Sequence, residues 1–176
     1  MDGRGTRHVR RASGLPEVTT LCEPLRRGVA AALLPRVAGD PVLDALVELA
    51  ASVVGASAAQ LALLTDRHVV VSAGGPVPWR VGDTGSLEAS LCSVTVLSGD
   101  VLVAADTRRH PWLCDLAPVV DGQVGAYLGA PLPGRDGSLV GAVCAYDREP
   151  REWSGRDVTL LCQVADVMAL HLQRLG

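Results

Sequence analysis

The most informative segment of the chain is residues 86–116, which read SLEASLCSVTVLSGDVLVAADTRRHPWLCDL. Its first part is apolar enough for a short helix, which Ser86 can cap and Gly99 ends. The segment DVLVAAD, residues 100–106, follows as a short strand. The polar, proline-broken segment 107–124 then forms a long loop, and long ordered loops usually carry function. We therefore expect this loop to carry function.

The chain before this stretch predicts a tail, a leader and the start of a folded domain. Residues 1–14 hold four arginines and no apolar periodicity, which is typical of a disordered basic tail. Residues 15–39 predict a helical leader that Pro24 begins or kinks. Its apolar positions at helical spacing are Val18, Leu21, Leu25, Val29 and Leu33. The domain itself spans residues 40–176, and Asp40 with Pro41 predicts the start of its first helix.

Four further apolar runs complete a pattern of strands and a closing helix. Residues 59–75 contain two runs separated by TDRH, which predicts an antiparallel hairpin. Residues 125–132 and 138–147 predict two more strands, and the Asp-Gly step between them suits a tight turn. Ser154 and Asp157 then form a weak variant of the capping box. After them two apolar lines mark a closing helix, Val158-Leu161-Ala165-Met168-Leu172-Leu175 and Leu160-Val164-Val167-Leu170.

Composition excludes several classes of protein. Apolar residues make up 48% of the chain, charged residues make up 20%, and the formal net charge is −3. This composition is typical of a folded globular protein, and the negative net charge does not indicate nucleic-acid binding. It also has no apolar run long enough to span a bilayer and no secretory signal, so we expect a cytoplasmic protein without a membrane partner. The five cysteines form no C-x-x-C pair, which predicts free thiols and no structural metal site.

The order of elements resembles that of the GAF domain, the small-ligand sensor module of many bacterial signalling proteins. The motifs that carry the resemblance are SLCSVTVLSGDVLVAADTRRHPW, AYLGAPL, GSLVGAVCAYDREPREWS and the closing helix, within residues 40–175. The resemblance implies an α+β fold with an antiparallel sheet of five to six strands. The N- and C-terminal helices would pack on one face of the sheet, and a ligand pocket would lie on the other.

The resemblance also implies that the pocket wall lies within residues 86–127. The candidate ligand-binding residues are Cys92, Asp106, Trp112, Cys114, Tyr127 and Asp147. Each has a structural alternative, since a free cysteine is often a small buried hydrophobe and an aspartate at a strand end often caps a turn. Trp112 and Tyr127 are equally suited to the core and to the pocket.

Three functions agree with this pattern. The first is a non-enzymatic sensor, without catalytic residues, whose pocket binds an unknown small ligand or senses redox state. Its terminal helices would form a homodimer and signal to an effector in trans or in a larger polypeptide. The second is a GAF-fold free methionine sulfoxide reductase that uses Cys92 and Cys114, 22 residues apart. The third is a ligand-free dimerisation scaffold. Bilin-binding GAF domains attach their chromophore through a cysteine that is followed by a histidine. No cysteine of this chain precedes a histidine, so the resemblance does not imply a bilin. The cofactor is otherwise unknown.

Overall fold

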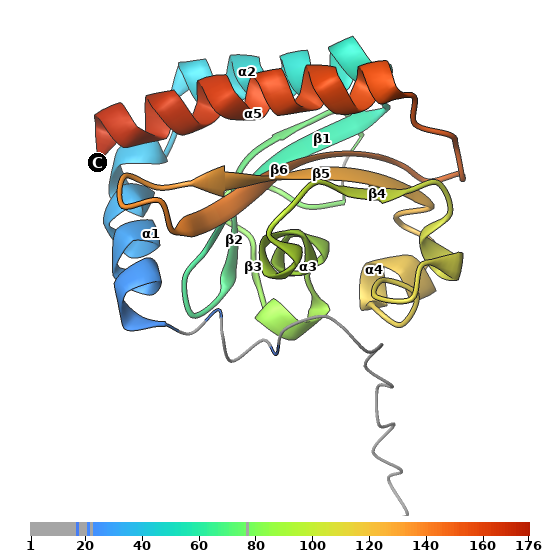
Figure 1. Ribbon diagram of the computed structural model, residues 1–176, viewed down its shortest axis with the longest axis horizontal. Coiled ribbons are helices and arrows are strands. Elements are labelled where there is room, and N and C mark those ends of the chain that lie inside the picture. Colours follow the sequence, from blue (N-terminus) through green and yellow to red (C-terminus); the bar gives the residue numbers. More distant parts are fainter. Residues whose placement is uncertain (1–16, 18–20, 22, 77) are drawn as a thin grey trace, which may run out of the picture.

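The computed structural model describes residues 17, 21, 23–76 and 78–176 of the chain, so the predicted basic tail lies outside the described residues. Six strands form one antiparallel sheet in the order β3-β2-β1-β6-β5-β4 (Figure 1). The strands are β1 (Ala58–Leu64), β2 (His68–Gly74), β3 (Thr84–Gly85), β4 (Leu102–Ala104), β5 (Ala126–Pro133) and β6 (Leu139–Asp147). The predicted α+β fold is thus confirmed. The two-residue strand β3 pairs with β2 at one edge of the sheet.

The two predicted hairpins set the register of the central strands. β1 pairs with β2, so that Leu64 lies opposite His68, and β5 pairs with β6, so that Gly129 lies opposite Cys144. Gly137 occupies the second hairpin turn with φ of 80°, which the Asp-Gly step had indicated. β1 also pairs with β6, which joins the hairpins into one sheet.

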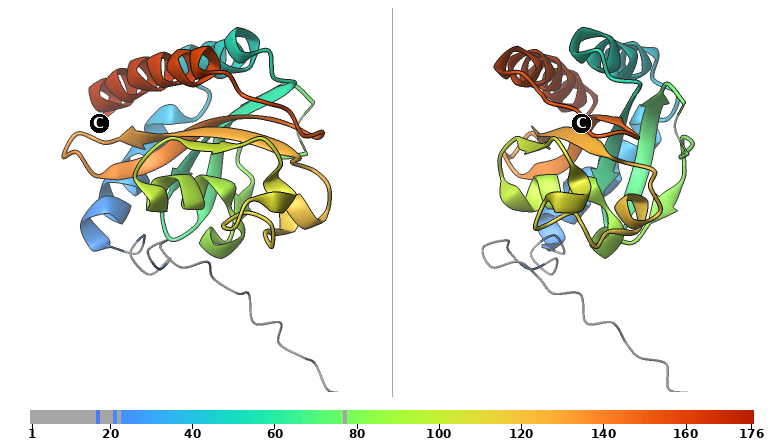
Figure 2. Two further views of the ribbon diagram at one scale, coloured as in Figure 1. Left: turned by 45° about the vertical axis from the view of Figure 1, so that its right-hand side comes forward. Right: turned by 90° about the vertical axis from the view of Figure 1, so that its right-hand side faces the viewer.

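Two long helices cover one face of the sheet, as Figure 2 shows: α2 (Pro41–Val54) and α5 (Gly155–Leu175). The Asp40 side chain caps α2 by accepting hydrogen bonds from Val42 N and Leu43 N. Ser154 and Asp157 form the predicted capping box at the start of α5. Both helices bury an apolar stripe against the sheet, in a core that includes Leu43, Leu161 and Met168.

The described part of the predicted leader contains one α-helix. The helix α1 (Pro24–Val37) begins at the proline, which suits the first helical position. Its buried apolar line is Ala30, Leu33 and Val37, whereas the predicted Leu25 is 72% exposed. Val18 lies outside the described residues. α1 therefore packs on the end of the sheet through its second half, and Arg26 Nη1 donates to Leu64 O at 2.7 Å.

The opposite face of the sheet carries shorter elements. They are the 3-10 turns η2 (Leu87–Ala89) and η3 (Thr107–Arg109), with the helices α3 (Leu91–Ser98) and α4 (Ala117–Val120). Ser90, and not Ser86, caps α3, because the residues after Ser86 form the separate turn η2. Gly99 ends α3 in the left-handed conformation with φ of 72°. A second apolar cluster lies between these elements and the sheet, so the sheet separates two cores.

None of the helices in the described part of the chain is long and apolar enough to cross a membrane.

Candidate functional site

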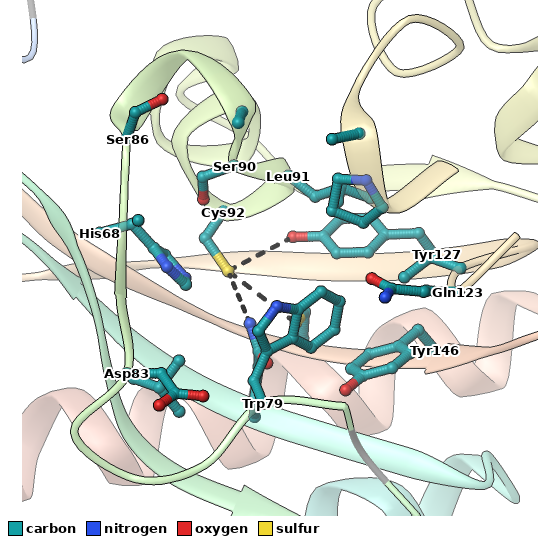
Figure 3. Close-up of a pocket in the computed structure, with 18 of the residues that line it drawn as sticks. His68, Trp79, Asp83, Ser86, Ser90, Leu91, Cys92, Gln123, Tyr127 and Tyr146 are labelled. Atoms are coloured by element: carbon teal, nitrogen blue, oxygen red, sulfur yellow. Dashed lines mark hydrogen bonds between the residues drawn. The ribbon is translucent and has the colours of Figure 1, made fainter. Parts of the chain in front are cut away.

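A pocket of about 230 Å³ lies between α3 and the sheet, on the face opposite α2 and α5 (Figure 3). β1, β2, β5 and β6 supply its floor, the first turn of α3 forms one wall, and the loop before β3 closes one side. The side chains that matter for chemistry are Gln60, His68, Trp79, Cys92, Tyr127, Cys144 and Tyr146. Most of the site is therefore assembled from separate strands.

Two thiols lie together where the wall formed by α3 meets the floor. Cys92 Sγ is 3.9 Å from Cys144 Sγ, and both residues are only 1% exposed. Gln60 Nε2 donates toward Cys92 Sγ at 3.8 Å, and Tyr127 OH does so at 4.0 Å. The hydroxyl of Tyr127 is itself 2.8 Å from Thr95 Oγ1. Cys92 is thus the acceptor at the centre of a small buried network.

The surroundings of the two thiols separate their pKa values. Hydrogen bonding from Cys144 lowers the pKa of Cys92, and His68 and Gln60 add to this effect against the opposing effect of burial. Cys92 also lies in the first turn of α3, where the helix dipole favours a thiolate. Burial raises the pKa of Cys144, and a thiolate at Cys92 would raise it further. Cys92 is therefore the thiol of the pair that ionises first.

Three buried polar atoms around the pocket have no hydrogen-bond partner among the described residues. They are Gln60 Oε1, His68 Nε2 and Tyr146 OH. Buried polar groups in folded proteins are nearly always hydrogen-bonded to protein or ordered water. Burial raises the pKa of Tyr146, so its hydroxyl stays protonated and can donate. Two potential donors and one acceptor are thus available to a molecule inside the cavity.

The pocket has an aromatic side and an uneven balance of charge. The ring of Trp79 meets the ring of Tyr146 edge-on, with centroids 5.7 Å apart and planes at 70°. Asp83 and Asp121 also line the pocket, whereas none of its described lining residues is Arg or Lys. Asp83 accepts a hydrogen bond from Arg80 N within its own loop. The described lining therefore offers no Arg or Lys side chain to a phosphate group.

The structure separates the six candidate residues of the sequence analysis. Cys92 and Tyr127 line the pocket, and the other four do not. Asp106 caps η3, since it accepts from Arg108 N and forms an ion pair with Arg108 at 3.0 Å. Asp147 accepts from Ser57 N at 2.8 Å and pairs with Arg151 at 3.0 Å. Both aspartates thus make turn-stabilising contacts, which was the alternative to a role in ligand binding.

Trp112 and Cys114 belong to the long loop and are partly buried. The ring of Trp112 packs edge-on against His110, with centroids 5.7 Å apart, and Trp112 contacts the second apolar cluster. Cys114 is free and partly exposed. The loop reaches the pocket instead through Ala117, Pro118, Asp121, Gln123 and Val124.

Four polar lining residues were missed because they lie outside residues 86–127. Gln60, His68, Cys144 and Tyr146 come from β1, β2 and β6. One signal was present, since Gln60 is a polar residue within the apolar run of β1 and is 5% exposed. Cys144 and Tyr146 are two residues apart and therefore lie on the same face of β6. The sequence does not show which face of the strand lines the pocket.

A GAF domain family model matches residues 39–172. The chain therefore belongs to the GAF domain family, which consists of sensory and regulatory domains. It has 34% identity over 89 residues to a cyclic di-GMP phosphodiesterase of Pseudomonas aeruginosa. That match takes in 49% of this chain and 15% of the relative, so the chain spans a small part of that protein.

Solved structures show the same fold at low identity. The GAF domain of an Acinetobacter phosphoenolpyruvate-protein phosphotransferase is 14% identical, with a TM-score of 0.65 over 86% of this chain and 95% of that one. A type II free methionine-R-sulfoxide reductase of Thermoplasma acidophilum is 17% identical, with a TM-score of 0.61 over 84% and 96%. The fold therefore serves both regulatory domains and enzymes, and the site must distinguish them.

Proposed function

We propose that this chain is a non-enzymatic sensory domain that binds a small molecule in the pocket beneath α3. The observation that carries the proposal is the set of three unpartnered buried atoms, on Gln60, His68 and Tyr146, around one cavity. Leaving such atoms unsatisfied costs about 1–3 kcal/mol each. A ligand that hydrogen-bonds to them would recover that free energy, which makes the pocket a ready binding site.

The lining indicates the chemical class of the ligand. A ligand with phosphate groups would enter a pocket that holds two aspartates and, among its described residues, no Arg or Lys. Phosphate sites usually use cationic side chains, often together with backbone amides at a helix N-terminus. The first turn of α3 does line this pocket, but two carboxylates and no described Arg or Lys accompany it. The pocket instead offers the rings of Trp79 and Tyr146 with neutral hydrogen-bonding groups. We therefore propose a small, neutral or cationic ligand with apolar surface.

The sheet connects the pocket to the terminal helices. β5 and β6 place Tyr127, Cys144 and Tyr146 in the pocket and pack α5 against their other face. A ligand that shifts these strands would change the packing of α5. The matched relative from P. aeruginosa is a much longer phosphodiesterase, which supports regulation of an effector in trans or in a larger polypeptide.

We also propose that two copies associate through α5. Val167 is 50% exposed and Leu170 is 59% exposed, and they lie three residues apart on one side of the helix. The adjacent helix α2 exposes Val42 and Leu49. Val164, which the sequence placed on the same line, is only 6% exposed and packs in the core. The proposed homodimer interface is therefore smaller than the spacing alone suggested.

A thiol-based sulfoxide reductase is the second candidate. The observation that favours it is Cys92, a thiol with a lowered pKa inside the pocket. The predicted partner Cys114 does not line the pocket, whereas Cys144 does. We therefore expect no thioredoxin-dependent reduction of free methionine sulfoxide. Turnover that is lost in Cys92→Ala, and also in either Cys114→Ala or Cys144→Ala, would replace the sensor with an enzyme.

Native mass spectrometry tests the sensor. The reduced protein is incubated with a small-molecule extract of bacterial cells and then exchanged into buffer. We expect an added mass whose bound fraction falls several-fold in His68→Leu, a change that removes Nε2 and keeps an apolar side chain. Asp106→Asn is the matched control, since Asp106 lies outside the pocket. The absence of any added mass would favour the ligand-free dimerisation scaffold.

A further inference from the structure

The thiols of Cys92 on α3 and Cys144 on β6 are arranged for a reaction that ligand binding does not require. Cys92 Sγ and Cys144 Sγ lie 3.9 Å apart, in van der Waals contact and without a bond between them. We propose that Cys92 and Cys144 form a dithiol site that a small hydroperoxide oxidises to an intramolecular disulfide. This inference rests on the thiol geometry and on the groups around the thiols, and it does not depend on the ligand proposed above.

The reaction takes place in two balanced steps. The thiolate of Cys92 attacks one oxygen of the hydroperoxide, so that an S–O bond forms and the O–O bond breaks. The leaving oxygen takes a proton and departs as water or an alcohol. The sulfur of Cys144 then attacks the sulfenic sulfur of Cys92, which forms the S–S bond and breaks the S–O bond. The departing hydroxyl takes the Cys144 proton as water, and the two thiols have together supplied two electrons.

The surroundings assign the first step to Cys92. Gln60 Nε2 and Tyr127 OH both donate toward its sulfur, and both contacts are stronger to a thiolate than to a thiol. Burial raises the pKa of Tyr127, so its hydroxyl remains a donor. Cys144 has a raised pKa and keeps its proton until the second step. The structure therefore provides one attacking and one resolving thiol.

The position of the thiols selects small oxidants. Both residues are 1% exposed, and both line the pocket, so a reagent reaches them through that opening. Cys114 and Cys162 are more exposed and lie outside the pocket lining. A bulky thiol reagent should modify Cys114 and Cys162 first, whereas hydrogen peroxide can enter the cavity.

Disulfide formation would change the pocket. The sulfurs must approach from 3.9 Å to a bond length of about 2.05 Å. Cys92 lies in the first turn of α3 beside Ser90 and Leu91, which also line the cavity. Oxidation would draw this turn toward β6 and remove the thiolate that accepts from Gln60 and Tyr127. The oxidised protein would thus have a pocket of different shape.

Peptide mapping tests the inference. The full chain is treated with hydrogen peroxide, denatured, alkylated and digested, and its cysteine peptides are identified by mass spectrometry. We expect one cross-linked species that joins Cys92 to Cys144, and its loss in Cys92→Ala and in Cys144→Ala. In Cys144→Ala, a sulfenic acid should be trapped on Cys92 by dimedone. Cys162→Ala is the control and should keep the cross-link.

Two outcomes would overturn the inference. One is wild-type protein in which Cys92 and Cys144 remain fully alkylatable after peroxide treatment. The other is a cross-link that joins either residue to a different cysteine. Neither outcome bears on the proposed ligand binding, because that proposal is tested separately on reduced protein by native mass spectrometry. The wild-type map decides the question even if an alanine variant fails to fold.

Discussion

Cys92 and Cys144 are 52 positions apart in the chain, yet their sulfur atoms lie 3.9 Å apart. The contact exists because α3 packs closely on β5 and β6, with its first turn over the middle of the sheet. Gly129 lies opposite Cys144 in the β5–β6 pair and leaves the space that this packing needs. A Cβ at that position would lie 2.5 Å from Tyr127 OH and 2.7 Å from Thr95 Oγ1.

Gly129→Ala should therefore destabilise the protein. The new methyl group must displace the Tyr127–Thr95 contact, and overpacking of this kind costs about 1–3 kcal/mol. Urea unfolding followed by circular dichroism measures the change. Gly155→Ala is the control, since nothing lies within 4 Å of its Cβ position and the change should stay within about 0.5 kcal/mol. Equal stability of the two variants would show that α3 does not need the space at Gly129.

The two buried tyrosines of the pocket should respond differently to removal of the hydroxyl. Tyr146 OH has no partner among the described residues, so Tyr146→Phe should leave the ligand-free protein equally stable or slightly more stable. Tyr127 OH is 2.8 Å from Thr95 Oγ1, so Tyr127→Phe should cost about 1 kcal/mol. Thermal unfolding of both variants without ligand makes the comparison. A loss of stability in Tyr146→Phe as large as in Tyr127→Phe would contradict the assignment.

A contact between Asp40 and His171 joins α2 to α5 and should make stability depend on pH. Asp40 Oδ2 is 3.0 Å from His171 Nε2. Burial raises the pKa of Asp40, but hydrogen bonds from His171, Leu43 and Val42 outweigh this, and the net pKa is lowered below its ordinary 3.8. The contribution of the carboxylate is therefore complete above about pH 3.8, the unfolded value, and is lost as pH falls through the lower folded value.

Comparing Asp40→Asn with Asp40→Ala separates the charge from the cap. Asparagine is also a good N-cap, so Asp40→Asn loses the charged contact to His171 and keeps the cap, whereas Asp40→Ala loses both and should cost about 1 kcal/mol more. The advantage of the wild type over Asp40→Asn should shrink in acid below pH 3.8. Urea unfolding at neutral and acidic pH measures it, and an advantage that persisted in acid would assign the effect to packing.

The proposed dimer predicts that a charge on the outer face of α5 will separate the two copies. Val167→Glu and Leu170→Glu should give a folded monomer by light scattering, because both side chains are at least half exposed and carry no core packing. Val120→Glu is the matched control, since Val120 is 67% exposed on α4 at the opposite face of the sheet. A wild type that is already monomeric at high micromolar concentration would reject the dimer.

The sequence alone was sufficient to predict the helix caps and turns that depend on neighbouring residues. The cap at Asp40, the capping box at Ser154 and the Asp-Gly turn at Gly137 each depend on a few neighbouring residues. The apolar period of α5 and the order of the strands were also readable, and they were sufficient for the GAF fold. The same local logic failed at Ser86, because the alternative cap Ser90 lies four residues later and a 3-10 turn separates them.

The side chains that meet in the pocket could be identified only once the strands and α3 were placed in space. Three strands supply the polar lining residues Gln60, His68, Cys144 and Tyr146. Side chains alternate between the two faces of a strand, but the sequence does not show which face lies under α3. A shift of one residue in strand register would turn each of them to the other face. From sequence alone we therefore favoured polar residues close to α3 in the chain, such as Asp106 and Cys114. Strand pairing and the packing of α3 on β6 placed Cys144 beside Cys92 instead, because contacts in a sheet depend on register and not on separation along the chain.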